Sequence, residues 1–362
     1  MFAKQQLPFK VLIAPLDWGL GHTTRCVPLI QSLKQAQCHV YVAGNPTALK
    51  LLQQEVTGVE YLPLEGYNIR YSSKRRLAWK ILKQTPKILR AIYKEHRWLK
   101  NVVTTHQIDI VFSDNRYGLY HKEATSIFIT HQLRIKAPFS WLEGVIQKIN
   151  YRFINRFDAC WVPDYAGKLN IAGVLSHPEQ LPAVRVQYIG PLSRLEVNYN
   201  IPSSTRYHWL VLLSGPEPQR SILERLMLQA INAVQHPVLL VRGLPLASTE
   251  IEVPPHCTVI NHLPAKDLQA LFKQSEYIIS RSGYTTIMEI LALQKKSILI
   301  PTPGQTEQEY LAKHLMHQHW CYSFEQQEDV AYHLQQARSF SYQLPQLPGN
   351  SLQAAVDSLL QS

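Results

Sequence analysis

Hydroxyl side chains follow an apolar strand within residues 280–311, in an arrangement that suits the binding of an anion. The apolar run at 277–279 predicts a buried parallel strand, and the Ser-Gly turn after it leads into a segment of helical periodicity. The first turn of that helix carries Thr285 and Thr286, whose hydroxyls add to backbone N–H groups that lack helical partners. Because a helix dipole is positive at this end, the sequence predicts a site for an anion such as a diphosphate.

A carboxylate lies one turn further along the same predicted helix. There Glu289 can accept two hydrogen bonds from the vicinal hydroxyls of a ribose. A second strand at 297–300 ends in a polar loop at 301–310, which should lie at the same edge of the sheet. Ligands of open parallel sheets bind beyond the carboxyl ends of the strands. We therefore expect both loops to face one ligand.

The same stretch resembles the donor-site motif of glycosyltransferase family 28. In that family the motif reads Arg-Ser-Gly, followed by a Thr, a Glu, a Pro-rich turn and a Gln. The matching residues of this chain are Arg281, Ser282, Gly283, Thr286, Glu289, Pro301, Pro303 and Gln308. The resemblance implies that Thr285 and Thr286 lie at the diphosphate and that Glu289 lies at the ribose. It also implies that Gln305 and Gln308 lie near the sugar.

The resemblance implies the GT-B architecture, an α/β fold in which two Rossmann-like, doubly wound domains face a cleft. The acceptor would bind to the N-terminal domain and the nucleotide-sugar to the C-terminal domain. Repeated strand–loop–helix spacing independently favours doubly wound parallel sheets. The expected segments are an N-terminal domain at 1–193, a linker at 194–208, a C-terminal domain at 209–345 and a last helix at 346–362 that returns to the first domain.

A glycine-rich turn follows the first predicted strand, residues 10–16. Gly19 and Gly21 allow a tight turn toward a helix predicted at 27–34, and His22 stands where the helix begins. The pattern lacks the full dinucleotide fingerprint, but it matches the first loop of many GT-B glycosyltransferases. By that resemblance His22 takes the proton from the acceptor hydroxyl or hydrogen-bonds a phosphate. The alternative is a histidine that only caps the helix.

Asp114 and His131 follow two further predicted strands, residues 108–113 and 126–130. Since both fall at carboxyl ends of strands, each can line the acceptor side of the cleft. Asp114 is the second candidate for the base. An ordinary role in a cap or loop is the alternative for either residue.

The loop after the strand predicted at 209–213 is a further candidate contact for the donor phosphates. Ser214, Gly215 and Arg220 offer a hydroxyl, a flexible backbone and a guanidinium group. Family 28 has more glycine here, and two prolines in this chain depart from its pattern. Leu263 precedes the next predicted helix, where the resemblance places the loop that contacts the nucleotide base through backbone groups.

The composition is that of an ordinary globular protein, with 46% hydrophobic and 17% charged residues, which excludes a disordered chain. Five cysteines, odd in number and without a Cys-x-x-Cys pair, indicate neither a disulfide framework nor a zinc site. We expect no metal and no other cofactor, because the sequence has no Asp-x-Asp cluster in a suitable context. No stretch approaches the roughly 20 apolar residues that span a bilayer, and no signal peptide precedes the first strand, so we expect a cytoplasmic protein.

The net charge of +11 is concentrated in residues 70–100, where eleven Lys or Arg accompany one acid, Glu95. A Thr-Pro pair at 85–86 predicts two helices, at 74–84 and 86–103. Such a basic amphipathic surface can dock on the anionic lipid of the inner membrane face. The alternative is a solvated surface that serves solubility. Nucleic acid is a poor candidate, because no binding module accompanies the charge.

These features together predict inverting transfer of a sugar without a metal. The donor would be a nucleotide-sugar, UDP-linked by resemblance, and the acceptor a hydroxyl of a lipid, a lipid-linked saccharide or a glycan. A nucleotide-sugar 2-epimerase of the same fold is one alternative, but it should have paired acids after the Ser-Gly turn, where this chain has only Glu289. The other is a non-catalytic protein that binds nucleotide-sugar or membrane, whose binding would survive His22→Ala and Asp114→Asn.

Overall fold

The computed structural model describes residues 8–17, 20–67, 77–137, 139–195, 205–244, 251–349 and 351–361. The chain forms two compact units. Unit 1 comprises Met1–Arg70, Ala78–Leu192 and Pro348–Ser362, and unit 2 comprises Tyr71–Leu77 and Ser193–Leu347. Gly19 and the basic residues at 70–76 lie outside the described residues, so the predictions on them stay predictions.

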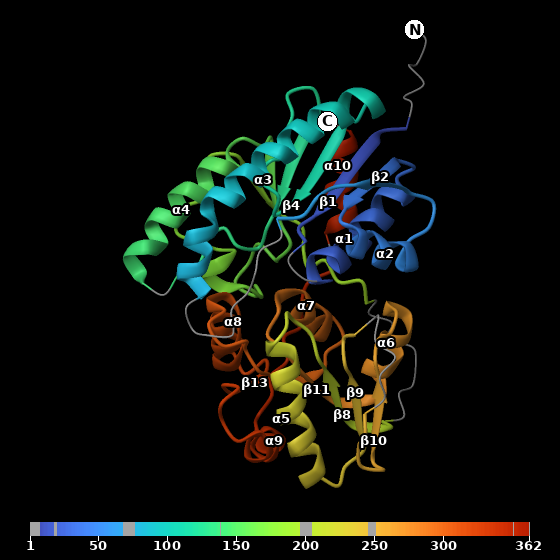
Figure 1. Ribbon diagram of the computed structural model, residues 1–362, viewed down its shortest axis with the longest axis vertical. Helices are drawn as coiled ribbons and strands as arrows, with labels where there is room; N and C mark the ends of the chain where they lie inside the picture. Colours follow the sequence, from blue (N-terminus) through green and yellow to red (C-terminus); the bar gives the residue numbers. More distant parts are fainter. Residues whose placement is uncertain are drawn as a thin grey trace. The chain divides into compact units, whose positions relative to one another are not determined.

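Unit 1 is built on a parallel sheet of seven strands in the order β3-β2-β1-β4-β5-β6-β7 (Figure 1). The strands are β1 (Lys10–Pro15), β2 (His39–Gly44), β3 (Glu60–Pro63), β4 (Ile110–Asp114), β5 (Thr125–Ile129), β6 (Ala159–Val162) and β7 (Arg185–Tyr188). β1 and β4 are central, and their apolar side chains are buried, as expected for strands covered on both faces. The predicted doubly wound sheet is confirmed.

Five α-helices of the described chain belong to unit 1. They are α1 (Leu20–Gln35), α2 (Pro46–Glu55), α3 (Leu77–His106), α4 (Ser140–Ile154) and α10 (Leu352–Leu360), with a 3₁₀ turn at Gly173–Leu175. The last helix, α10, packs beside α1 (Figure 1), and Ser32 of α1 donates a hydrogen bond of 2.6 Å to the Gln353 side chain. The end of the chain is therefore joined to its beginning within one unit.

The prediction of two helices in the basic segment is wrong, because α3 is one helix with Pro86 inside it. A proline removes one helical hydrogen bond, but the chain on either side can stay helical at a cost of about 3 kcal/mol. Burial of Ile92, Leu99 and Val103 holds the second half of α3 on the sheet. None of the helices in the described ranges is both long and apolar enough to cross a membrane.

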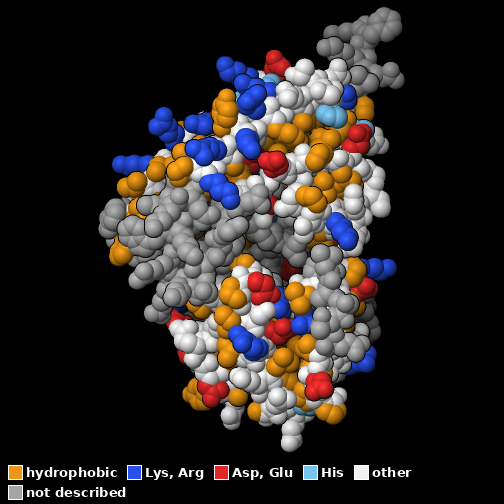
Figure 2. All heavy atoms as spheres, viewed as in Figure 1, with side chains coloured by type: hydrophobic (Ala, Val, Ile, Leu, Met, Phe, Trp, Pro, Cys, Tyr) orange, Lys and Arg blue, Asp and Glu red, His pale blue; other side chains and the backbone are white. Residues whose placement is uncertain are grey.

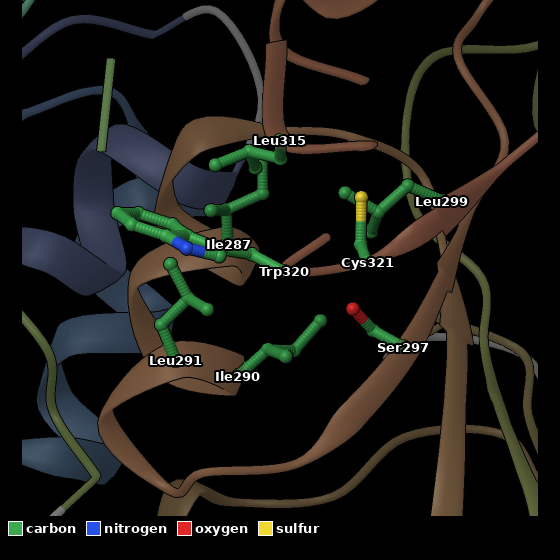
Figure 3. A pocket seen from close by; sticks show the side chains of 8 residues that line it. All are labelled: Ile287, Ile290, Leu291, Ser297, Leu299, Leu315, Trp320 and Cys321. Carbon is green, nitrogen blue, oxygen red and sulfur yellow. The ribbon is translucent and has the colours of Figure 1, made fainter. Parts of the chain in front are cut away.

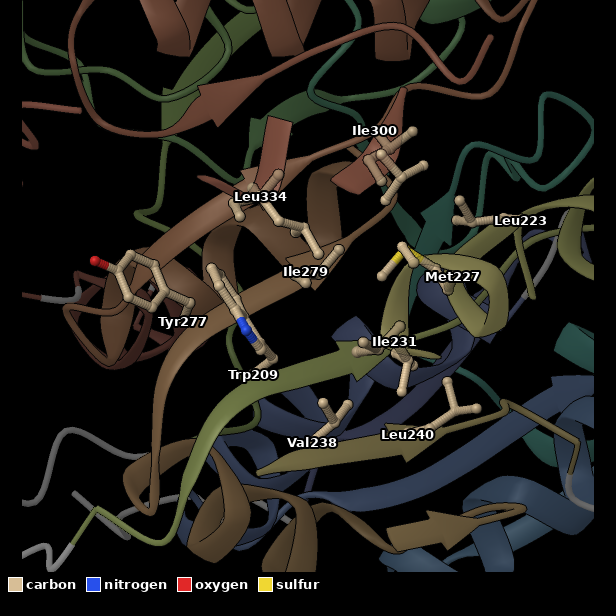
Figure 4. Packing of buried hydrophobic residues seen from close by; sticks show 14 of the residues in the cluster. Trp209, Leu223, Met227, Ile231, Val238, Leu240, Tyr277, Ile279, Ile300 and Leu334 are labelled. Carbon is tan, nitrogen blue, oxygen red and sulfur yellow. The ribbon is translucent and has the colours of Figure 1, made fainter. Parts of the chain in front are cut away.

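Unit 2 repeats the plan with a parallel sheet of six strands in the order β10-β9-β8-β11-β12-β13. Its elements are β8 (Tyr207–Leu212), α5 (Gln219–Ala233), β9 (Val238–Val241), β10 (Cys257–Ile260), α6 (Ala265–Lys273), β11 (Ser275–Ser280), α7 (Tyr284–Ala292), β12 (Lys296–Leu299), α8 (Thr306–His317), β13 (Tyr322–Ser323) and α9 (Val330–Ser339). Figure 4 shows the core, where Trp209 of β8 and Ile279 of β11 lie among Leu334 of α9 and Met227 of α5.

The polar loop predicted at 301–310 is shorter than expected, because α8 begins at Thr306 with Gln305 as its N-cap. Glu307 and Glu309 stand in the first turn of α8, where carboxylates interact favourably with the helix dipole. Glu309 also accepts a hydrogen bond of 2.8 Å from the backbone N–H of Gly304. The polar residues from position 305 onward therefore form the N-cap and first turn of α8.

Helix α7 is fixed on the sheet by its apolar side. Ile287, Ile290 and Leu291 face Leu299 of β12 and the ring of Trp320 (Figure 3). The space among these side chains is too small to hold a water molecule, so this face serves packing alone. Burial of one side of α7 sets the direction in which its amino end points.

Candidate active site

Both sheets have a topological switch point, where the strand order reverses. In unit 1 it lies between β1 and β4, because β2 and β3 extend from β1 while β5 to β7 extend from β4. In unit 2 it lies between β8 and β11. Open parallel sheets bind ligands beyond the carboxyl ends of the strands at such points. The ends of these four strands and the segments after them contain most of the predicted site residues.

His22 and Asp114 come together at the switch point of unit 1. The Nδ1 atom of His22, in the first turn of α1, lies 3.1 Å from Oδ2 of Asp114 at the end of β4. The exposed fraction is 16% for the His22 side chain and 1% for that of Asp114. A carboxylate only accepts, so the imidazole Nδ1–H donates and the lone pair of a neutral ring lies on Nε2. This arrangement orients a general base.

The pKa of His22 lies below its ordinary value, which keeps the ring neutral at pH 7. Burial is the largest cause and Arg25 lowers the pKa further, whereas Asp114 raises it. Burial alone would raise the pKa of Asp114, but Arg25 and His22 hold it well below its usual range. Asp114 is therefore a weak proton acceptor, and its geometry suits orientation of His22.

Arg25 is a site residue that the sequence analysis missed. Its Nε donates to Oδ2 of Asp114 at 2.9 Å and its Nη2 donates to Oδ1, so the two groups form a fork-shaped pair. Its Nη1 lies 3.1 Å from Nδ1 of His131, which follows β5. Helix α1 begins at Leu20, seven residues before the predicted start at 27. A helix predicted to begin at Leu20 would have placed Arg25 one turn after His22 on the same face of the helix.

Gly21 belongs to the first turn of α1, and its carbonyl oxygen accepts a hydrogen bond of 3.2 Å from the Thr24 hydroxyl. Gly19, its predicted companion in the acceptor loop, lies outside the described residues. In the described ranges, no three His, Cys, Asp or Glu side chains come together as ligands for a metal ion.

The amino end of α7 in unit 2 is a suitable anion site. Its N-cap is Gly283, and glycine offers no side chain to cap the first N–H groups. A Cβ at this position would meet no described atom within 4 Å. Thr285 and Thr286 are half-buried in the first turn. A helix amino end with space around its glycine N-cap suits an anion, and the contact with a diphosphate stays a prediction.

Ser282 and Gln308 connect the two loops that were predicted to face one ligand. The Ser282 hydroxyl donates to the carbonyl oxygen of Gln308 at 2.9 Å, and the Gln308 side-chain oxygen accepts from the N–H of Thr302 at 2.9 Å. Both side chains thus bind protein backbone. Gln305 lies beside them as the N-cap of α8, half-buried.

Arg281 was expected at the donor, but its side chain is buried and donates to the protein. Its Nη1 donates to the carbonyl oxygens of Ile300 and Pro301, at 3.2 and 3.1 Å. Its Nη2 donates to the carbonyl oxygen of Gln219 at 2.9 Å and to the side chain of Gln326. Buried carbonyls need such partners, so Arg281 holds the loops after β11 and β12 to the start of α5.

Arg220 likewise binds carboxylates of its own unit, in place of the phosphate contact that we expected. Its Nε lies 2.6 Å from Glu217 and its Nη1 lies 3.3 Å from Glu224, while Glu224 also pairs with Arg242 at 2.5 Å. Burial would raise the pKa of Glu224, but these arginines lower it below its ordinary value. Arg220 stabilises the start of α5.

The rest of the loop after β8 stays accessible. Gly215 is exposed and has a φ of +101°, a backbone conformation that favours glycine, and Ser214 beside it is half-buried. A Cβ at Gly215 would meet no described atom within 4 Å. Leu263 lies half-buried between β10 and α6. These three residues keep their predicted positions at the carboxyl edge of the sheet.

Glu289 is buried in α7, and its Oε1 accepts a hydrogen bond of 2.8 Å from Nε of Arg194. This ion pair was missed, because the two residues are 95 positions apart and no local pattern indicates it. A carboxylate has room for several hydrogen bonds, so the ion pair is compatible with the predicted contact to ribose hydroxyls.

Comparisons with known proteins bear on the family and the fold of this chain. Residues 238–345 match the glycosyltransferase family 28 C-terminal domain. A search of curated proteins finds no match.

Solved structures resemble the whole chain. The glycotransferase of kitacinnamycin is 16% identical, with a TM-score of 0.66 over 98% of this chain and 95% of its own. The calicheamicin glycosyltransferase CalG4 is 12% identical, with a TM-score of 0.64 over 98% and 94% of the two chains. MurG of Acinetobacter baumannii is 14% identical, with a TM-score of 0.60 over 98% and 100%. The predicted resemblance is confirmed: residues 238–345 match the family 28 C-terminal domain, and the whole chain has the GT-B fold of these solved glycosyltransferases.

Proposed function

We propose that the protein is an inverting glycosyltransferase that moves a sugar from a nucleotide-sugar, with UDP as the nucleotide, to a hydroxyl of a lipid, a lipid-linked saccharide or a glycan. The observation that carries the proposal is the oriented pair of His22 and Asp114 at the switch point of unit 1. A sheet that only binds a nucleotide does not need a half-buried histidine paired with a buried carboxylate. The family 28 domain in unit 2 supplies the second half of the argument.

The donor half of the proposal rests on the amino end of α7. The diphosphate would lie against the open backbone at Gly283 and the hydroxyls of Thr285 and Thr286, where the helix dipole favours negative charge. Glu289 would accept from the ribose hydroxyls, while Gln305 would contact the sugar. Arg281, Ser282 and Gln308 would act indirectly, because they hold these loops in place.

The chemical step would be a single displacement at the anomeric carbon. Nε2 of His22 accepts the proton of the acceptor hydroxyl while that oxygen forms the new bond to the anomeric carbon. The bond from this carbon to the diphosphate oxygen breaks, and its electron pair leaves with the diphosphate. The helix end in unit 2 stabilises the added charge. One displacement inverts the configuration, and Asp114 stabilises the imidazolium that forms.

The acceptor half of the proposal includes a membrane surface. Figure 2 shows Lys and Arg side chains gathered over the part of unit 1 where α3 runs in Figure 1. The exposed basic residues of the described part of α3 are Lys87, Arg90, Lys94, Arg97 and Lys100. Among them Leu89 and Tyr93 are 48% and 64% exposed. Basic side chains beside exposed apolar ones suit an anionic lipid surface, as a lipid-linked acceptor would require.

The test is a ligand screen followed by product analysis. Thermal unfolding of the full chain would be measured with UDP, dTDP, GDP and CDP, and then with sugar conjugates of the nucleotide that stabilises most. A ligand at 100 times its dissociation constant adds about 2.7 kcal/mol to the stability of the folded state. NMR of the incubated conjugate distinguishes the outcomes. Release of the nucleoside diphosphate with an acceptor supports transfer, a C2 epimer indicates the epimerase, and binding without turnover contradicts an enzyme.

A further inference from the structure

Arg25 connects two histidines that come from different parts of unit 1. It lies on α1 with 2% of its side chain exposed, between Asp114 at the end of β4 and His131 after β5. Each of its hydrogen bonds has a fixed direction, because a guanidinium group only donates and stays charged in proteins. The hydrogen bonds of Arg25 and Asp114 therefore determine which ring nitrogen of each histidine carries the proton.

His131 must carry its proton on Nε2. Its Nδ1 lies 3.1 Å from Nη1 of Arg25, and an N–H of the guanidinium points at it, so Nδ1 holds the lone pair. His22 has the opposite arrangement. Its Nδ1 lies 3.1 Å from a carboxylate oxygen of Asp114, so Nδ1 holds the proton. The two rings of one site are thus opposite tautomers.

We propose that Arg25 is a positioning residue that fixes opposite tautomers of His22 and His131. It acts on His22 through Asp114 and on His131 directly. His22 can then accept a proton at Nε2, and His131 can donate one from Nε2. The consequence for catalysis rests on the proposed function, in which His22 is the base. The tautomers themselves do not depend on it. A histidine base in the wrong tautomer lowers the catalytic rate about as much as a missing base, so a residue that fixes the tautomer supports catalysis.

The charges around His22 agree with a neutral ring. The positive charge of Arg25 compensates the negative charge of Asp114, and His22 also faces His131, while Cys26 of α1 contacts Asp114 at 3.9 Å. Burial and Arg25 lower the pKa of His22, and Asp114 raises it. A lysine could not replace Arg25, since one ammonium lacks the planar fork that reaches a carboxylate by two nitrogens and a ring by the third.

The first experiment reads the tautomers directly in the full-length protein. Long-range ¹H–¹⁵N NMR of histidine-labelled protein at pH 7.5 distinguishes Nδ1–H from Nε2–H rings. The chain has 15 histidines, so the signals of interest would be assigned from their loss in His22→Asn and His131→Asn. We expect an Nδ1–H ring for His22 and an Nε2–H ring for His131. The same tautomer on both rings, or a charged His131, would overturn the proposal.

The second experiment compares two buried arginines. In Arg25→Lys we expect both rings to lose their single tautomers, His131 because its guanidinium donor is gone and His22 because Asp114 loses the fork-shaped pair that orients it. The matched control is Arg116→Lys, since Arg116 is fully buried two residues after Asp114 and pairs with Glu95 at 2.7 Å. The control should leave both ring patterns unchanged. Equal changes of the ring patterns in both variants would mean that any change at a buried arginine disturbs unit 1, which contradicts the proposal. If Arg25→Lys does not fold, the tautomers of the wild-type protein decide whether the proposal holds.

Kinetics separate this proposal from the proposed function. With an identified donor and acceptor, Arg25→Lys should lower kcat about 10- to 100-fold with little change in the donor KM. Arg25→Gln removes a positive charge beside His22, so the acid limb of the kcat profile should move to higher pH. A protein with the expected tautomers but no transfer would contradict only the function. Transfer with unchanged kinetics in both variants would contradict the role of Arg25.

Discussion

The carboxyl edges of the two sheets carry different polar groups, although both sheets are parallel and both have a switch point between two central strands. In unit 1 the titratable ring of His22 contacts Asp114, which also pairs with Arg25. In unit 2 the buried arginines bind the protein itself, and the start of α7 carries the N-cap Gly283 followed by two half-buried threonines. The first arrangement suits proton transfer and the second suits anion binding.

This difference teaches which polar residues of a motif meet a ligand. Arg281, Ser282 and Gln308 belong to the motif that indicated the donor site, yet each forms hydrogen bonds with backbone groups of unit 2. Their residue types are needed because buried carbonyl and N–H groups require partners. A motif thus describes the frame of a site as much as its contacts.

The largest expected effect is the loss of the base in unit 1. His22→Ala should lower kcat by about 10² to 10⁴, because acid–base catalysis contributes that factor, while the affinity for the donor stays unchanged. Steady-state transfer and donor titration measure both quantities. The control is His39→Ala, which removes an exposed histidine paired with Glu60 at 2.6 Å. A loss of only a few-fold in His22→Ala would move the role of the base to another residue.

The pH dependence sharpens the same point. The pKa of His22 lies below 6.5, so transfer should be constant near pH 7 and fall about tenfold per unit below the pKa of the folded protein. The unfolded chain protonates this ring first as the pH falls, so the contribution of His22 to stability is complete above pH 6.5 and is lost at lower pH. A kcat profile whose acid limb lies above pH 7 would contradict the assignment.

In unit 2, Arg220→Met should affect stability and spare the donor. The change removes one partner from the buried Glu224, which keeps Arg242, and the partner of the half-exposed Glu217, so we expect a loss of about 1.5–3 kcal/mol of unfolding free energy. Urea denaturation measures the loss, and titration with UDP measures the affinity. An affinity loss above tenfold in the folded variant would restore the phosphate contact that the sequence indicated.

A smaller effect is expected at Glu289. Glu289→Ala should weaken donor binding by about 1–3 kcal/mol, the range for a lost charge-assisted hydrogen bond. Arg194→Ala removes only the ion pair at 2.8 Å. If Glu289 contacts ribose, its variant should lose more affinity than Arg194→Ala. Equal losses, with no further loss in the double variant, would reduce Glu289 to the partner of Arg194.

The smallest effect per residue is expected at the surface of unit 1. Sedimentation with anionic vesicles should decrease with salt and in the combined variant Lys87→Gln, Arg90→Gln, Lys94→Gln and Arg97→Gln, since each charge contributes about 1 kcal/mol. A control with the same charge change replaces exposed lysines elsewhere, namely Lys50, Lys122, Lys168 and Lys313. Equal recovery of both variants with the vesicles would exclude α3 as the docking surface.

Sequence patterns predict the sheets well because buried strands are short apolar runs between polar turns. The strands predicted at 126–130 and 297–300 are β5 and β12, each displaced by one residue, and the helix after residue 283 begins where its turn residues indicated. Contacts of Arg25 and Arg194 could not be predicted, since they join residues 89 and 95 positions apart that only the folded sheets bring together. The continuity of α3 across Pro86 was missed because a proline is compatible with either outcome.

The most direct test of the division between the sheets is hydrogen–deuterium exchange of the whole protein with and without UDP. Binding should slow the exchange of backbone amides at residues 281–286 and 301–308, which flank the amino end of α7. The amides at 20–25 and 114–118 in unit 1 should exchange at an unchanged rate. Protection at the unit 1 segments in place of those of unit 2 would contradict the account.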